Sequence, residues 1–310
     1  MKYLKIIRLP NLLLLALMQL TFRYGFLKQQ DGYLSLADWQ YSLLVLSTVL
    51  LAAAGYVIND IFDQETDTIN RPEKVIVGKA ISESRAYNIY VGLNIIGVAI
   101  GFYLSNVIQK PSFATIFIFI AASLYFYATT LKKMLLLGNI LVAFILGLSV
   151  LIIGVFDLYP ATYDGNRDKM GLLFKILTDY AVFAFVLNLI REIIKDAEDI
   201  KGDYNQGMQT LPIVLGVNRT AKIVFSLVAI AVAIVLWYTN KHLMGFDLYY
   251  AVLYVLFLVL GPLLYVLIKS WNAKSVSDFH HLSTILKWVI FFGILSIAVI
   301  TYNIKINTNA

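Results

Sequence analysis

Cysteine is absent from the 310-residue sequence, which excludes disulfides and thiolate metal sites. Charge is also scarce: Asp, Glu, Lys and Arg make up 14% of the residues, whereas a soluble domain has about 25%. Hydrophobic residues make up 60%, and the mean hydropathy is +0.76. These values exclude a water-soluble globule. The net charge of +6 fits basic loops on one face of a membrane protein and requires no nucleic-acid partner.

The apolar residues come in long blocks separated by short polar stretches, a pattern typical of polytopic helical membrane proteins. A membrane β-barrel would alternate in runs of about 10 residues instead. A hydrocarbon core of ~30 Å requires about 20 apolar residues per helix. This measure predicts a single all-α domain over residues 1–310 with nine transmembrane helices, at 9–26, 40–58, 87–107, 113–131, 135–156, 174–194, 221–239, 248–268 and 284–303.

Lysine and arginine are unevenly distributed over the loops between these helices. When alternate loops are counted, 17 of the 25 lie on the side of the N-terminus. Because basic loops stay in the cytoplasm, we expect a multi-pass protein of the cell (inner) membrane with a cytoplasmic N-terminus and an external C-terminus. Two external segments, 28–39 and 157–169, are long, and the sequence suggests no role for the second.

The acidic residues are concentrated in two short segments. Ten of the 19 Asp and Glu residues lie within residues 60–73 and 192–203. Each segment has three Asp residues at positions i, i+3 and i+7, namely Asp60, Asp63 and Asp67, and Asp196, Asp199 and Asp203. At about 100° per residue, each row falls within an arc of about 60° on one helical face. Both rows begin at the cytoplasmic end of an expected span, so they lie on the same side of the membrane.

Six neighbouring carboxylates need cations to offset their mutual repulsion. Oxygen ligands suit Mg²⁺, which is typically bound by one or two carboxylates together with substrate phosphates. The two rows therefore predict a site that holds a diphosphate through bridging Mg²⁺, beside an apolar bundle that suits a polyprenyl tail. Stabilising the leaving diphosphate would let the allylic C–O bond break and leave a cation for an acceptor to trap. A solvated acidic loop explains one such row better than two matched rows.

Basic and amide side chains accompany the rows. Arg71 follows the first row, Arg191 precedes the second, and Lys132 ends the fourth expected helix on the same side. Free diphosphate oxygens need such donors. Asn188 lies one turn before Arg191 in the sixth expected span, and Asn11 lies in the first. Polar groups within a span tend to face a cavity, so we expect both to contact substrate.

Two segments resemble the signatures of the UbiA superfamily of intramembrane prenyltransferases. The first, within motif 59–72, reads NDIFD at 59–63 and NRP at 70–72; the second, within motif 191–212, reads DAEDIKGD at 196–203. Within the superfamily, the chain resembles the branch of digeranylgeranylglyceryl phosphate synthases. That likeness rests on LGNI at 137–140, REIIKD at 191–196 and TLPIVLG at 210–216.

The resemblance implies a UbiA-type bundle of nine helices, Mg²⁺ dependence, and transfer of a geranylgeranyl group to geranylgeranylglyceryl phosphate in membrane-lipid synthesis. It implies that the six Asp residues of the two rows hold the Mg²⁺-diphosphate as the catalytic and metal-binding residues. Asn59, Arg71 and Lys132 would help to hold the phosphates. Tyr127 and Asn11 match a tyrosine near the end of the fourth helix and an amide in the first, which implies that both bind substrate.

Three other interpretations are open. An aromatic acceptor such as 4-hydroxybenzoate would use the same fold and Asp residues. The additional basic residues Lys74, Lys79 and Lys133 favour a phosphorylated glycerol acceptor only slightly. A cation transporter would carry its carboxylates near the bilayer midplane rather than at the helix ends. An alcohol phosphotransferase would need Gly directly after its second Asp, where this sequence has Gln64.

Overall fold

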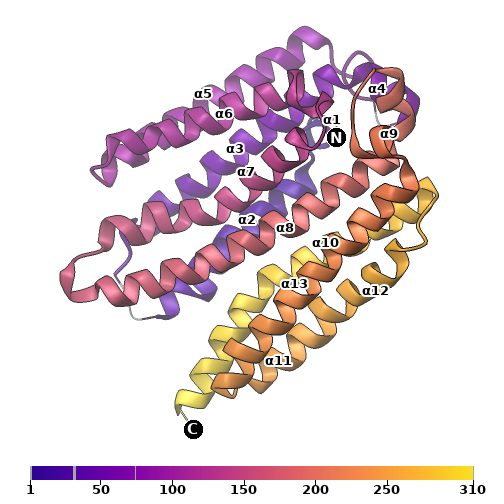
Figure 1. Ribbon diagram of the computed structural model, residues 1–310. Coiled ribbons are helices and arrows are strands. Elements are labelled where there is room, and N and C mark those ends of the chain that lie inside the picture. Colours follow the sequence, from indigo (N-terminus) through magenta and orange to yellow (C-terminus); the bar gives the residue numbers. More distant parts are fainter. Residues whose placement is uncertain (1, 31–32, 74, 310) are drawn as a thin grey trace.

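Helices make up nearly all of the computed structural model, which describes residues 2–30, 33–73 and 75–309 (Figure 1). The α-helices are α1 (Lys2–Ile6), α2 (Leu9–Gly25), α3 (Asp38–Phe62), α4 (Gln64–Asn70), α5 (Glu83–Val107), α6 (Ala114–Thr129), α7 (Leu137–Ile153), α8 (Arg167–Asn205), α9 (Leu211–Leu215), α10 (Val217–Tyr238), α11 (Tyr249–Val255), α12 (Gly261–Ser270) and α13 (Val276–Asn309). Among the described residues, β-structure is limited to one bridge between Val77 and Ile81. The predicted all-α class is confirmed.

Eight helical segments in the described part of the chain are long and apolar enough to cross a membrane. They are Asp38–Phe62, Glu83–Val107, Pro111–Thr129, Leu137–Ala161, Asp164–Asn205, Val217–Phe246, Tyr249–Ser270 and Val276–Thr308. The predicted count of nine is too high by this measure, and α2 is the difference. With 17 residues, α2 is ~26 Å long at 1.5 Å per residue, at the lower limit of the range of about 17–25 residues for a membrane-spanning helix.

The two ends of the bundle differ in what they carry. The N-terminus, α1, α4 and α9 gather at one end, and the C-terminus lies at the opposite end (Figure 1). We call the first the motif end, because residues 59–72 and 191–212 meet there, and the opposite one the far end. The long helix α8 packs against α7, α10 and α13, while α13 also contacts α2. Helix α8 therefore joins the N-terminal helices to the C-terminal ones.

Apolar side chains fill the bundle in separate clusters. One cluster surrounds Phe117 and Phe156 and takes in α8 from Met170 to Ala181. Another surrounds Leu286 on α13 and takes in α8 from Leu187 to Ala197. Because close van der Waals packing of side chains holds helices together within a bilayer, α8 is anchored on both sides along its length. A smaller cluster, around Ile6 and Val57, fixes α1 to the motif end.

A buried ion pair closes the far end. Arg23 of α2 and Asp157, just after α7, are 1% and 0% exposed, with Nη1 and Oδ2 3.2 Å apart. Arg23 Nη2 donates to the carbonyl oxygen of Leu36 at 2.5 Å, and the Leu36 N–H donates to Asp157 Oδ1 at 2.9 Å. The Tyr41 ring lies 4.2 Å from the guanidinium. The two long external segments noted in the sequence are thus joined through one buried polar network.

Candidate active site

A cavity of about 1210 Å³ extends from the motif end into the bundle. Its wall includes Asp60, Asp67 and Arg71 near the motif end, and Tyr238 and Ile300 at depth. Along α8 the lining residues run from Tyr180 to Lys195, so the cavity follows that helix for ~22 Å. Pockets for small molecules measure about 300–1,000 Å³. The cavity therefore has room for a long-chain lipid.

The residues singled out from the sequence divide into two groups around this cavity. Those that line it are Asn11, Asn59, Asp60, Asp67, Arg71, Tyr127, Asn188 and Arg191. Those outside its wall are Asp63, Lys132, Asp196, Asp199 and Asp203. Of the second group, Asp63, Lys132, Asp196 and Asp199 make contacts between segments at the motif end. Lys74 lies outside the described residues.

The first Asp row is divided between two helices. Asp60 belongs to α3, Asp63 follows the end of α3, and Asp67 belongs to α4, so the prediction of one continuous helical face was wrong here. Both carboxylate oxygens of Asp63 have a partner. Asn59 Nδ2 donates to Oδ2 at 2.5 Å, and Lys132 Nζ donates to Oδ1. Gln64 Nε2 donates to the Ile61 carbonyl oxygen at 2.9 Å. These side-chain contacts stabilise the end of α3.

The second row is continuous, as predicted. Asp196, Asp199 and Asp203 all lie within α8, whose 39 residues extend well beyond the expected span 174–194. Asp196 Oδ2 accepts a hydrogen bond from Asn139 Nδ2 of α7 at 2.8 Å. Asp199 Oδ1 lies 2.7 Å from Arg71 Nη2. The row therefore faces α7 and the first motif.

A close contact between α4 and α8 brings the two motifs together. Asn70 Nδ2 donates to the Asp199 carbonyl oxygen at 2.9 Å, and the Gly202 N–H donates to Asn70 Oδ1 at 2.8 Å. A Cβ at Gly202 would lie only 2.8 Å from the Thr66 carbonyl oxygen. Since that oxygen is part of the backbone, a larger residue would force α4 away from α8. Gly202 is what permits this approach.

Each row is neutralised in part by a basic side chain. Arg8 Nη2 lies 2.9 Å from Asp60 Oδ1, Lys132 binds Asp63, and Arg71 binds Asp199. Burial, with the neighbouring carboxylate of Asp63, raises the pKa of Asp67 above its ordinary value. Among the described residues, no three His, Asp or Glu side chains group closely enough to hold one metal ion. The rows are thus paired with cations rather than gathered into one ligand cluster.

Two carboxylate or amide oxygen atoms at this site are buried without a hydrogen-bond partner among the described residues. They are Asn59 Oδ1 of the first motif and Glu198 Oε1 of the second. Buried acceptors of this kind are rare in native structures and require a partner. An oxygen-binding cation or a hydrogen-bond donor on a substrate would satisfy them, and the donor set of carboxylates and amide oxygen suits Mg²⁺.

Arg8 and Lys287 reach the cavity although the sequence analysis did not single them out. Arg8 has a left-handed backbone (φ 51°, ψ 53°) between α1 and α2, and its guanidinium lies 5.1 Å from the centre of the Tyr56 ring. Left-handed backbone is uncommon for residues other than glycine, and here it directs the side chain toward Asp60. Lys287 donates to Asn11 Oδ1 at 3.2 Å. The sequence did offer a signal for Lys287, because a single lysine inside the expected span 284–303 is typical of a binding site.

Comparison with known proteins agrees with this arrangement. The sequence profile of the UbiA prenyltransferase family matches residues 20–302. The digeranylgeranylglyceryl phosphate synthase of Saccharolobus solfataricus is 34% identical over 86% of each chain. That of Methanobrevibacter smithii is 32% identical over 84% of this chain and 87% of its own.

Solved structures share the fold. A structure described for digeranylgeranylglyceryl phosphate synthase in membranes superposes with a TM-score of 0.62, at 23% identity over 98% of both chains. A UbiA homolog from Archaeoglobus fulgidus bound to DMAPP and Mg²⁺ superposes with a TM-score of 0.59, at 16% identity over 96% of this chain and 99% of its own. The helical bundle is therefore a fold shared with solved UbiA homologs, one of which was solved with DMAPP and Mg²⁺ bound.

Proposed function

This chain belongs to the UbiA prenyltransferase family, and we propose that it transfers a geranylgeranyl group from its diphosphate to geranylgeranylglyceryl phosphate in membrane-lipid synthesis. As a family member it is a multi-pass membrane prenyltransferase. The observation that carries the proposal is the cavity, which begins at Asp60 and Asp67 and continues through the bundle to Ile300. A diphosphate head and a long prenyl tail need such a combination of polar mouth and apolar depth.

We assign the Mg²⁺-diphosphate to the two Asp rows. Asp60, Asp63 and Asp67 would hold it from one side and Asp196, Asp199 and Asp203 from the other, with the free Oδ1 of Asn59 as a further acceptor. Mg²⁺ would offset the negative charge that grows on the diphosphate as the allylic C–O bond breaks. The fold supports this assignment because Asn70 and Gly202 hold the two motifs against each other.

The basic residues at the motif end would serve the same step. Arg8, Arg71 and Lys132 are bound to carboxylates of the rows, so a bound diphosphate would share them. Charge-assisted hydrogen bonds from these groups to phosphate oxygens would stabilise the leaving group. Tyr127, in the cavity wall, would contact the prenyl chain near the bond that breaks.

The orientation in the membrane follows from the distribution of charge. The motif end carries the N-terminus and the loops with most of the lysine and arginine, so we place it in the cytoplasm. The far end, with the C-terminus and the buried pair of Arg23 and Asp157, then faces outward. Water-soluble prenyl diphosphate head groups and Mg²⁺ would reach the Asp rows from the cytoplasm.

A competition assay tests the acceptor. Purified protein in nanodiscs receives Mg²⁺, geranylgeranyl diphosphate and equal amounts of geranylgeranylglyceryl phosphate and 4-hydroxybenzoate, and the products are identified by mass. The proposal expects a doubly prenylated glycerol phosphate. A prenylated aromatic product would replace the proposed acceptor with a quinone precursor and leave the roles of the Asp rows intact. Transport of a cation across the membrane of vesicles that contain the protein, without any transfer product, would favour a cation transporter.

The length of the donor chain is tested at Gly293. This glycine of α13 lines the cavity, and a Cβ there would meet nothing within 4 Å. A phenylalanine at this position would therefore fit the helix and occupy part of the cavity that we assign to the prenyl tail. We expect Gly293→Phe to lower kcat/KM for geranylgeranyl diphosphate by at least about tenfold, and for dimethylallyl diphosphate by less than about twofold. The measurement is steady-state kinetics with both donors.

A control for this variant is Gly92→Phe. Gly92 of α5 is also free of neighbours within 4 Å, but it lies outside the cavity wall, so both donors should react as in the unmodified protein. Equal losses with the long and the short donor in Gly293→Phe would show that the cavity does not hold the prenyl tail.

A further inference from the structure

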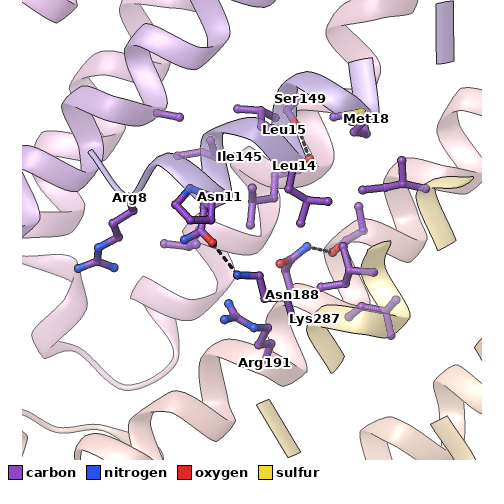
Figure 2. Close-up of a pocket in the computed structure, with 18 of the residues that line it drawn as sticks. Arg8, Asn11, Leu14, Leu15, Met18, Ile145, Ser149, Asn188, Arg191 and Lys287 are labelled. Carbon is purple, nitrogen blue, oxygen red and sulfur yellow. Dashed lines mark hydrogen bonds between the residues drawn. The ribbon is translucent and has the colours of Figure 1, made fainter. Parts of the chain in front are cut away.

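Four polar side chains from three helices meet at the cavity wall apart from the Asp rows. They are Asn11 of α2, Asn188 and Arg191 of α8, and Lys287 of α13 (Figure 2). Lys287 Nζ donates to Asn11 Oδ1 at 3.2 Å. Asn188 Nδ2 donates to the Ala184 carbonyl oxygen at 2.7 Å, which leaves its side-chain oxygen toward the same space. We call Arg191 and Lys287 the cationic pair.

Helix α8 separates the cationic pair from the second Asp row. Arg191 precedes Asp196 by five residues, which is a rotation of about 140° around the helix and a rise of ~7.5 Å. Arg191 and Asn188 line the cavity, whereas Asp196, Asp199 and Asp203 do not. Lys287 comes from α13, which supplies no residue to either row. An anion bound by the cationic pair would therefore lie apart from the second row, in the cavity that Asp60 and Asp67 of the first row also line.

The other basic residues of the cavity wall are already engaged or solvated. Arg8 binds Asp60, Arg71 binds Asp199, and Lys195 binds Glu192 through contacts of 2.9 and 3.0 Å, while the remaining two, on α1, are exposed. Within the described residues, Arg191 comes no closer than 4.0 Å to a carboxylate oxygen, that of Glu192. Among the described residues, the only hydrogen-bond partner of Lys287 is the neutral amide oxygen of Asn11.

A pair of cations is costly where these residues lie, since the one nearby carboxylate among the described residues, that of Glu192, is 4.0 Å from Arg191 and is shared with Lys195. Both fall inside the expected spans, 174–194 and 284–303, and ionisable groups within a membrane span are rare and tend to serve a binding site. The two positive charges repel each other. Arg191 Nε is also buried without a hydrogen-bond partner among the described residues. All three features are relieved by one anion placed between the two side chains.

The number of charges points to a phosphate monoester. Such a group carries about −1.5 to −2 charges at pH 7, which matches two cations, whereas an aromatic carboxylate carries one charge. A diphosphate would be held at the Asp rows, where carboxylates can bring in a metal ion. The apolar wall that continues below Lys287, through Ile290 and Ile294 of the same helix, suits the hydrocarbon chain attached to the head group.

We propose that Arg191 and Lys287, positioned by Asn188 and Asn11, form the site that binds the phosphate of the acceptor lipid. The inference rests on the proposed function, because it takes the acceptor to be a phosphorylated lipid. It adds a specificity-determining residue, Lys287, and separates the acceptor's head group from the donor's diphosphate. With the head group held there, the free hydroxyl of the acceptor would point toward the Asp rows, where the donor's allylic carbon lies.

Equilibrium binding is the test, with two lipids that differ only in the phosphate: geranylgeranylglyceryl phosphate and geranylgeranylglycerol. Binding to the full chain in nanodiscs is measured without donor or Mg²⁺, so that no turnover is needed. The unmodified protein should bind the phosphorylated lipid more tightly, and Lys287→Met should weaken that binding by about 10- to 100-fold. Binding of the unphosphorylated lipid should not change. Lys287→Arg, which keeps the charge, should retain most of the affinity.

Kinetics provide the second readout. Lys287→Met should raise KM for the phosphorylated acceptor and leave KM for geranylgeranyl diphosphate within about twofold, because a single cation contact is lost only for the acceptor. Lys222→Met is the matched control: Lys222 is an exposed lysine of α10 outside the cavity wall, near the Trp271 ring. It should behave as the unmodified protein in both measurements.

Each outcome decides between the two proposals. Unchanged binding of the phosphorylated lipid by Lys287→Met, or an equal rise in KM for the donor, overturns the cationic pair as the acceptor site. If the unmodified protein binds the phosphorylated lipid through Lys287 but forms no product from it, the site stands and the proposed reaction fails. If the unmodified protein does not distinguish the two lipids, the site is overturned, whatever product the competition assay yields.

Discussion

Replacing Asp60 or Asp196 with asparagine is expected to lower kcat/KM by roughly 10²–10³-fold, the loss typical of removing one preorganised electrostatic contact from an active site. Each change removes a negative charge while keeping the size of the side chain. Asp60 lies in the cavity wall beside Arg8, and Asp196 accepts a hydrogen bond from Asn139, which an asparagine oxygen can still accept. The chain should therefore fold and lose its hold on the cation-diphosphate.

Transfer from geranylgeranyl diphosphate over a range of Mg²⁺ concentrations measures this effect, with thermal denaturation as the check on folding. Asp247→Asn is the matched control, since Asp247 lies in an exposed loop at the far end and has a left-handed backbone (φ 55°) that asparagine tolerates. Full turnover in either row variant would contradict the role assigned to the Asp rows. If a variant loses activity only because it no longer folds, the replaced residue supports the structure and does not bind the Mg²⁺-diphosphate.

Removal of Arg23 is expected to destabilise the protein by about 3–5 kcal/mol, because it leaves a buried carboxylate without its partner. Arg23 and Asp157 are 1% and 0% exposed, so water cannot take over the lost contacts. Arg23→Met would also remove the hydrogen bond to the Leu36 carbonyl oxygen and the contact with the Tyr41 ring. The expected result is a marked fall in thermal denaturation temperature in nanodiscs, with the chemistry of the motif end unchanged in the remaining folded protein.

A double-mutant cycle separates this effect from loss of packing. Arg23→Met and Asp157→Leu should each be strongly destabilising, whereas the double variant should lose much less than their sum, because apolar residues replace the buried pair together. Arg85→Met, at an exposed position near the start of α5, controls for the loss of one arginine. Additive losses in the double variant would mean that the two residues do not act as a pair.

Several features of the fold and the site were predictable because they depend on short stretches of sequence. Hydropathy placed the long helices, since each crosses the membrane through its own apolar residues. The three-residue and four-residue spacing placed Asp196, Asp199 and Asp203 on α8 as one row. The two signatures led to the UbiA family, which the match over residues 20–302 confirms. The bounds of α2, Leu9–Gly25, agree with the predicted 9–26 to within one residue. The break at Asp63 was not predicted, because it involves a contact with Lys132, 69 residues away.

Tertiary structure alone decided which polar side chains from distant parts of the chain contact each other. Arg8 and Asp60 are 52 residues apart, and Asn11 and Lys287 are 276 apart, so no local pattern could pair them. The same holds for Asn70 and Gly202, whose contact sets the distance between the two Asp rows. Local hydropathy and helical periodicity are properties of the chain near each residue, and they specify the helices and the rows. The cavity, the ion pairs and the cationic pair arise only when those helices pack, because packing brings distant side chains within contact distance.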